Sequence, residues 1–144
     1  MAARIGSAEW QGTLQDGEGT VTVGQAVYSG PYTFATRFED GEEAANPENL
    51  VAAAEAACFT MALNNELFQH DHSPARVATT ARAYIRRIDD LPTIARIELE
   101  CEAVIPDIEE DHFIEHAENA KKNCIISRAL AGVPEIELSA KLVH

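Results

Sequence analysis

The chain is poor in cysteine and in basic residues. Its three cysteines, at positions 58, 101 and 124, form no C-x-x-C pair, and their odd, low number does not fit the disulfide framework of a small secreted domain. Only 11 lysines and arginines stand against 24 aspartates and glutamates, which gives a net charge of −13. No basic stretch with interleaved aromatic residues offsets this charge, so we expect no nucleic-acid partner.

A long apolar stretch is also lacking. The apolar run at residues 50–63 is interrupted by Glu55 and is shorter than the roughly 20 residues of a membrane-spanning helix. The first residues, MAARIGSAEW, contain no apolar core of a signal peptide. We therefore expect a cytoplasmic protein with no membrane partner. At 144 residues, the chain is long enough for one hydrophobic core, and we expect a single domain over residues 1–144.

The stretch that organises the rest of the chain is a predicted helix over residues 46–68. Asn46 is a favourable N-cap, Pro47 suits the first helical position, and the helix dipole favours an ionised Glu48 in the first turn. An apolar face follows helical spacing, and it consists of Leu50, Ala54, Cys58, Met61 and Ala62. With so little polar surface, this helix is expected inside the molecule, where its many alanines let a second helix approach closely.

Strands and shorter helices are predicted on both sides of this helix. The predicted strands are residues 9–14, 19–23 and 32–40 before it, and residues 75–88, 93–105 and 135–143 after it. A second helix is expected between Pro106 and Cys124, and a short helical turn follows in 125–131. The fold class is therefore α+β: three strands, a long central buried helix, two strands, two helices and one strand, with the strands pairing antiparallel.

Two of the cysteines lie on apolar helix faces. Cys124 ends the apolar face of the second helix, and Cys58 lies in the middle of the first. Both faces should turn toward the same core, so these two cysteines can meet, although plain buried packing explains their positions equally well. Cys101 lies in a strand among inward-facing aliphatic residues, where a cysteine behaves as a small hydrophobic side chain. The helix dipole fades within one turn, so a reactive Cys58 would need activation by another side chain.

Three segments resemble the signature regions of the OsmC/Ohr family, the osmotically inducible and organic hydroperoxide resistance proteins. They are TRFE at 36–39, NPENLVAAAEAACFTMAL at 46–63 and KKNCIISRALAG at 121–132. The TRFE form places the chain nearer the OsmC branch. The family commonly has proline directly after its second cysteine, whereas this chain has Ile125 there.

The resemblance implies a thiol-dependent peroxidase that reduces organic hydroperoxides, and hydrogen peroxide as a further candidate, to alcohols or water. Cys58 matches the attacking cysteine, Cys124 the resolving cysteine, Arg37 the active-site arginine and Glu48 the glutamate that orients it. A Cys58 sulfenic acid would condense with Cys124 to a disulfide, and an external dithiol would restore both thiols. The family also implies an intertwined homodimer with active sites at the subunit interface, and it requires no flavin, haem, metal or other cofactor.

Two other functions remain open from the residues. A redox-sensing or interaction protein could use the same cysteine pair without turning over peroxide. A zinc hydrolase could use His112, Glu115 and His116, since they match H-x-x-E-H, whose two histidines can share a metal. Three further side chains could form an apolar substrate wall, or could simply belong to the core: Phe38, Phe59 and Met61.

Overall fold

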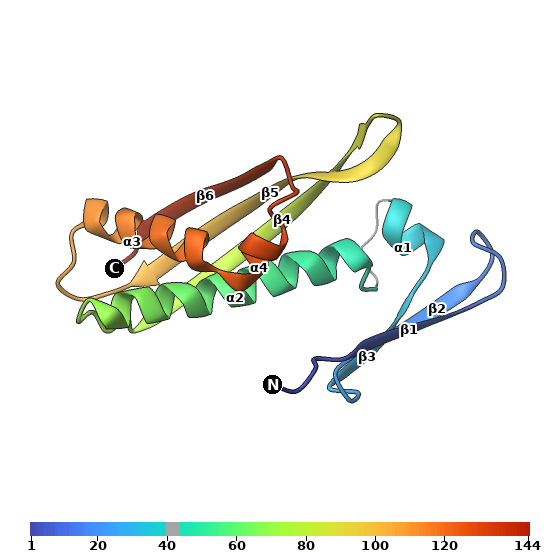
Figure 1. The fold of residues 1–144 in the computed structure, drawn as a ribbon, viewed down its shortest axis with the longest axis horizontal. Helices are drawn as coiled ribbons and strands as arrows, with labels where there is room; N and C mark the ends of the chain where they lie inside the picture. Colours follow the sequence, from blue (N-terminus) through green and yellow to red (C-terminus); the bar gives the residue numbers. More distant parts are fainter. Residues whose placement is uncertain (40–43) are drawn as a thin grey trace. The chain divides into compact units, whose positions relative to one another are not determined.

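A computed structural model describes residues 1–39 and 44–144 (Figure 1). The chain divides into two compact units, Met1–Leu50 and Val51–His144. Within the described residues, the fold has two three-stranded sheets and four helices. The predicted α+β class is confirmed. The single domain and the homodimer remain predictions.

The first unit contains a three-stranded antiparallel sheet. Its strands are β1 (Gly6–Gln11), β2 (Glu18–Val23) and β3 (Tyr28–Tyr32), in the order β1-β2-β3. Trp10 and Tyr32 flank Gly19, and their rings meet edge to face with centroids 5.4 Å apart. A Cβ atom at Gly19 would lie 2.6 Å from both rings, so only glycine lets the two aromatic side chains pack here.

The predicted strand over residues 32–40 is wrong. β3 ends at Tyr32, and residues Phe34–Phe38 form the short helix α1; Asp40 lies outside the described residues. Thr33 caps this helix, because its Oγ1 accepts a hydrogen bond from the Thr36 N–H at 3.2 Å while the Thr36 Oγ1 accepts one from the Thr33 N–H at 2.8 Å. The alternating aromatic residues therefore follow helical spacing, which places the Phe34 and Phe38 rings 4.9 Å apart.

The second unit contains the other sheet, with strands β4 (Arg76–Ile88), β5 (Leu91–Val104) and β6 (Glu135–Leu142) in the order β4-β5-β6. β4 and β5 form an antiparallel hairpin, but β5 and β6 are parallel. The expectation of antiparallel pairing throughout is thus wrong for this last pair. Helices α3 (Glu110–Asn123) and α4 (Ile125–Ala129) form the crossover between β5 and β6 that a parallel pair requires (Figure 1).

Helices α2 and α3 pack against the inner face of this sheet. The strongly buried core residues are Phe59, Leu63, Leu67, Leu99, Cys101, Ala103, Ile105, Phe113, Ala117, Ala120 and Cys124. The predicted alternation of β5 is confirmed, since Ala95, Ile97, Leu99, Cys101 and Ala103 are all buried. In the part of the chain that the structure describes, no helix combines the length and the apolar character needed to cross a membrane.

The long predicted helix is confirmed as α2 (Pro47–Gln69), but its buried face differs from the predicted one. The buried side chains are Glu55, Phe59, Leu63 and Leu67, spaced four residues apart. On the predicted face, Ala54 is exposed and Met61 is 75% exposed. Residues 50–63 are apolar on nearly every side, so periodicity could not separate the two faces, and the larger Phe59 and Leu63 side chains fill the core instead.

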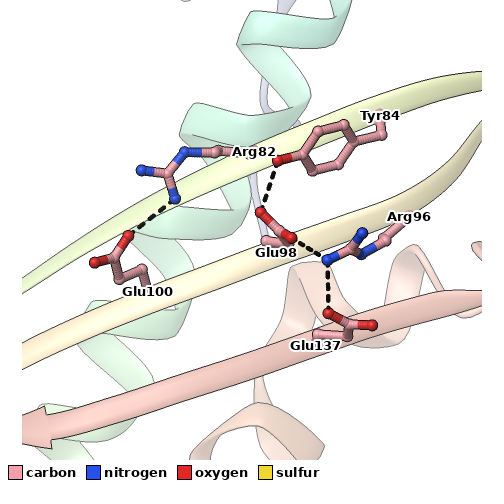
Figure 2. Close-up of polar contacts among 6 residues, drawn as sticks. All are labelled: Arg82, Tyr84, Arg96, Glu98, Glu100 and Glu137. Atoms are coloured by element: carbon pink, nitrogen blue, oxygen red, sulfur yellow. Dashed lines mark hydrogen bonds and ion pairs between the residues drawn. The ribbon is translucent and has the colours of Figure 1, made fainter.

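The outer face of the second sheet carries a network of charged side chains (Figure 2). Arg82 donates a hydrogen bond to Glu100 at 3.0 Å, and the Tyr84 hydroxyl donates one to Glu98 at 2.7 Å. Glu98 and Glu137 stand opposite each other on β5 and β6, where two like charges would repel. Arg96 donates to both carboxylates, so it offsets this repulsion.

Candidate functional site

Cys58 and Cys124 meet at one pocket of the second unit. Cys58 lies on α2, and Cys124 lies between α3 and α4, 66 positions later in the chain (124 − 58). The pocket has a volume of about 330 Å³, and its lining also includes Met61, Ala62, Asn65, Glu66, Asn123 and Ile125. Both thiols line this pocket, and both are free. The expectation that these two cysteines come together is met; their chemical roles remain predictions.

The Cys124 thiol is held by the junction of two helices. Its backbone N–H closes α3 by donating to the Ala120 carbonyl at 2.8 Å, and its Sγ accepts a hydrogen bond from the Ser127 N–H at 3.5 Å. Cys124 is thus the C-cap of α3 and the N-cap of α4. Ile125 takes the first position of α4, a position that favours proline. A proline directly after the cysteine would therefore fit the start of this helix as well as Ile125 does.

Burial raises the pKa of the Cys124 thiol, and the neighbouring Cys58 thiol and Glu55 carboxyl act in the same direction. The hydrogen bonds from Ser127 oppose this increase. The balance keeps Cys124 protonated at neutral pH. Cys58 is partly exposed, whereas Cys124 is only 1% exposed, so Cys58 is the thiol that a molecule entering the pocket reaches first.

Glu55 is a buried carboxyl group beside this site that the sequence analysis did not identify. It is fully buried on α2, and its Oε1 accepts a hydrogen bond from the Ser127 hydroxyl. Its Oε2 has no partner among the described residues. Burial raises the pKa of Glu55, and the Ser127 hydrogen bond opposes this shift. In the sequence, Glu55 showed only as the interruption of an apolar run. Its contact with Ser127 joins residues 72 positions apart, so no local pattern could reveal it.

The raised pKa of Glu55 makes the stability of the fold depend on pH. Above the ordinary value of 4.5, the unfolded chain releases this proton while the folded protein keeps it, so the stability associated with Glu55 falls as pH rises. Glu55→Gln removes the titration while keeping the size of the side chain. We expect its free energy of unfolding, measured in urea from pH 5 to 8, to decline less than that of the wild type.

A matched control for this experiment is Glu115→Gln on α3, where the glutamate is exposed. It should reproduce the wild-type slope. Glu66, Glu98 and Glu102 have lowered pKa values, so their contributions are lost only as pH falls and do not overlap with this range. An unchanged slope in Glu55→Gln would show that Glu55 is ionised in the folded protein throughout this range.

Cys101 occupies the core, as the sequence predicted. Its side chain is fully buried on β5, opposite Thr79 of β4. Burial raises the pKa of its thiol, and a hydrogen bond with Thr79 opposes the shift. The Thr79 hydroxyl also accepts a hydrogen bond from Thr60 of α2 at 2.8 Å. Cys101 does not line the pocket of the other two cysteines.

Arg37 and Glu48 form an ion pair in the first unit. Arg37 Nε and Nη2 both donate to Glu48 Oε1, at 3.1 and 2.9 Å. Asn46 links the two segments that carry them, since its Nδ2 donates to the Thr36 carbonyl at 2.9 Å and its Oδ1 caps α2 through the Asn49 N–H at 2.7 Å. The last turn of α1, which carries Arg37, and the first turn of α2, which carries Glu48, therefore position the pair. This pair belongs to the first unit and the cysteine pair to the second, and the structure describes each pair by itself.

The residues predicted to form a substrate wall or a zinc site do not lie together in the structure. Of the three proposed wall residues, Met61 lines the cysteine pocket, Phe59 is fully buried in the core, and Phe38 of the first unit is 50% exposed with its ring 5.2 Å from the Arg37 guanidinium. The H-x-x-E-H grouping is wrong for the described residues, because His116 groups with Glu66 and His70 rather than with His112. This cluster could hold a metal ion.

The chain matches known protein sequences over most of its length. Residues 39–139 match the family described as OsmC-like protein. A protein named Peroxiredoxin OsmC from Escherichia coli is 38% identical over 138 residues, which cover 95% of this chain and 94% of that protein. A protein of the same name from Shigella flexneri matches at the same level.

Solved structures share the fold. An OsmC-like protein from Mycoplasma pneumoniae superposes with a TM-score of 0.76 at 18% identity, over 99% of each chain. An organic hydroperoxide resistance protein from Elizabethkingia anophelis superposes with a TM-score of 0.70 at 25% identity, over 99% of this chain and 98% of that chain. Sequence and fold agree with the resemblance of the three signature segments, and the chain belongs to the OsmC-like protein family.

Proposed function

We propose that this protein is a cysteine-based peroxidase that reduces organic hydroperoxides to alcohols. The observation that carries the proposal is that Cys58 and Cys124 line the same pocket, which a small molecule can enter. Family membership supports it, as does the 38% identity to proteins named Peroxiredoxin OsmC.

In the first step, the Cys58 thiolate attacks the terminal oxygen of the hydroperoxide. The S–O bond forms as the O–O bond breaks, so the sulfur becomes a sulfenic acid and the alkoxide leaves and takes up a proton as the alcohol. Cys58 suits this role better than Cys124 because it is the more exposed of the two thiols. Met61, Ala62 and Ile125 give the pocket an apolar side that favours an alkyl group over hydrogen peroxide.

In the second step, Cys124 attacks the Cys58 sulfenic acid. A disulfide forms, and the sulfenic hydroxyl leaves as water with the proton of the Cys124 thiol. The hydrogen bond from the Ser127 N–H holds the Cys124 sulfur in place, and the Ser127 hydroxyl donates to Glu55, which fixes Ser127 in turn. An external dithiol then reduces the disulfide, which suits a reducing compartment such as the cytoplasm.

Arg37 is proposed to bind the peroxide oxygens and to stabilise the departing alkoxide, with Glu48 orienting its guanidinium. The Nε and Nη2 groups of Arg37 are engaged by one oxygen of Glu48, which leaves further N–H donors of the guanidinium for a substrate. We propose that active sites form at the interface of a homodimer, as in the family. The exposed apolar residues of α2, such as Met61, fit a surface that a second copy covers.

The same cysteine pair would serve a redox sensor, and turnover separates the two functions. With cumene hydroperoxide and an excess of dithiol, we expect steady consumption of many equivalents of peroxide per chain. Lipoyl dithiols and thioredoxin should be compared as reductants. Oxidation that stops after one equivalent per chain, with dithiol still present, would favour the sensor instead.

A further inference from the structure

Three side chains of types that can ligate a metal ion lie together between the C-terminal end of α2 and α3, within the second unit: Glu66, His70 and His116. Glu66 Oε1 lies 3.1 Å from His116 Nδ1 and 3.7 Å from His70 Nδ1. All three ligand atoms lie within 4.8 Å of one another. Glu66 lies in the last turn of α2, His70 directly follows that helix, and His116 comes from α3. The cluster therefore joins two separate segments of the fold.

The spacing of these atoms is close to that of a tetrahedral zinc site. Ligands about 2.1 Å from a tetrahedral zinc ion lie roughly 3.4 Å from one another. The two distances from Glu66, 3.1 and 3.7 Å, fall on either side of this value. The two histidine nitrogens lie within 4.8 Å of each other, and the 53% exposed His70 side chain can move closer to His116. In doing so, His70 Nδ1 would give up its hydrogen bond to the Glu66 carbonyl.

The environment also suits a cation. The side chains of Glu66 and His116 are only 15% and 14% exposed, and Asn119 Nδ2 supports the Glu66 carboxylate from 3.4 Å. Glu66 Oε1 and His116 Nδ1 now share a hydrogen bond of 3.1 Å, which a bound ion would replace. The His72 ring stands edge to face with the His116 ring, with centroids 5.7 Å apart, which makes His72 a candidate for the fourth ligand.

We propose that Glu66, His70 and His116 bind a divalent transition-metal ion of the Zn²⁺ class, with His72 or water as the fourth ligand. Two or three imidazoles and one carboxylate select such ions over Mg²⁺ or Ca²⁺, which prefer oxygen ligands alone. The bound ion links the end of α2 to α3. Glu66 also lines the pocket of Cys58 and Cys124, so the metal lies beside that pocket. This site goes beyond the proposed peroxidase activity and does not depend on it.

Binding is measured by competition between the reduced protein and a chromophoric zinc chelator at pH 7.5. We expect one Zn²⁺ per chain at this site. His116→Gln and His70→Gln should each weaken its binding at least tenfold. His70 is half-exposed, so His70→Gln keeps the fold even if His116→Gln destabilises it. The matched control is His112→Gln, which removes an exposed histidine one turn earlier on α3 and should leave the affinity unchanged.

The cysteine thiols are the competing ligands, and a Cys58→Ser, Cys124→Ser double variant separates them from the cluster. This variant should still bind one Zn²⁺, and its Co²⁺ form should show visible bands without the intense near-ultraviolet absorption of a cobalt–thiolate bond. The proposal is overturned if the double variant binds no Zn²⁺ at 100 µM free metal. It is also overturned if His70→Gln binds as tightly as the wild type, or if His112→Gln weakens binding as much as His70→Gln does.

Discussion

Cys58→Ser is expected to abolish peroxide consumption, lowering kcat/KM by several orders of magnitude. A serine hydroxyl is not ionised at neutral pH and cannot form a sulfenic acid, so the chemical step has no nucleophile. The exchange of sulfur for oxygen at this partly exposed position changes the packing little, so the fold should be retained. The rate is measured as loss of cumene hydroperoxide with excess dithiol.

Cys101→Ser is the matched control for this variant, because the same atom is exchanged in a buried thiol outside the pocket. It should consume peroxide at nearly the wild-type rate per folded chain. Its free energy of unfolding should fall by about 1–3 kcal/mol, because a hydroxyl group is buried in place of a thiol. Equal losses of activity in the two variants would contradict the assignment of Cys58 as the nucleophile.

Mapping of the oxidised protein tests the second cysteine. Peroxide-treated wild type should contain a disulfide between Cys58 and Cys124, with Cys101 unmodified. Protein in which residues 58 and 124 are neither linked nor oxidised would contradict the proposed chemistry altogether.

Arg37→Lys is expected to lower kcat/KM by about 100-fold, although the positive charge is kept. This is the smaller end of the rate loss that follows from removing one hydrogen-bond donor to the transition state. A thiol with an ordinary pKa of about 8.5 is roughly 3% ionised at pH 7, so complete ionisation could accelerate the reaction only about thirtyfold. Positioning of the reactants can contribute far more. The fixed fork of guanidinium donors should therefore matter more than its charge, and lysine cannot reproduce that fork.

The matched control is Arg82→Lys, which changes another arginine that pairs with a glutamate, on the outer face of the second sheet (Figure 2). This variant should keep the wild-type rate. A near-wild-type rate for Arg37→Lys would remove Arg37 from the mechanism. A loss of activity in Arg82→Lys as large as that in Arg37→Lys would indicate a general effect of replacing arginine.

Part of the candidate site could be predicted from the sequence, since helical spacing and strand alternation are local. The helix that carries Cys58, the second helix that ends at Cys124 and the alternation of β5 around Cys101 follow from apolar residues that recur with a fixed period. These patterns placed Cys58 and Cys124 on apolar helix faces and Cys101 in the core, so the sequence indicated that the first two can meet, although α2 buries its Glu55 face more deeply than the face of Cys58.

The tertiary structure alone decided the remaining features, because each depends on groups distant in the chain or on a choice between similar local patterns. The mutual capping of Thr33 and Thr36 made residues 34–38 a helix, although their alternation also fits a strand. Core packing chose the Glu55 face of α2 over the equally apolar Ala54 face.

The crossover through α3 and α4 made β6 parallel to β5. The contact of Glu55 with Ser127, and that of Glu66 with His116, join residues 72 and 50 positions apart. Periodicity shows which side of an element faces inward, but only the packed chain shows which polar groups meet there.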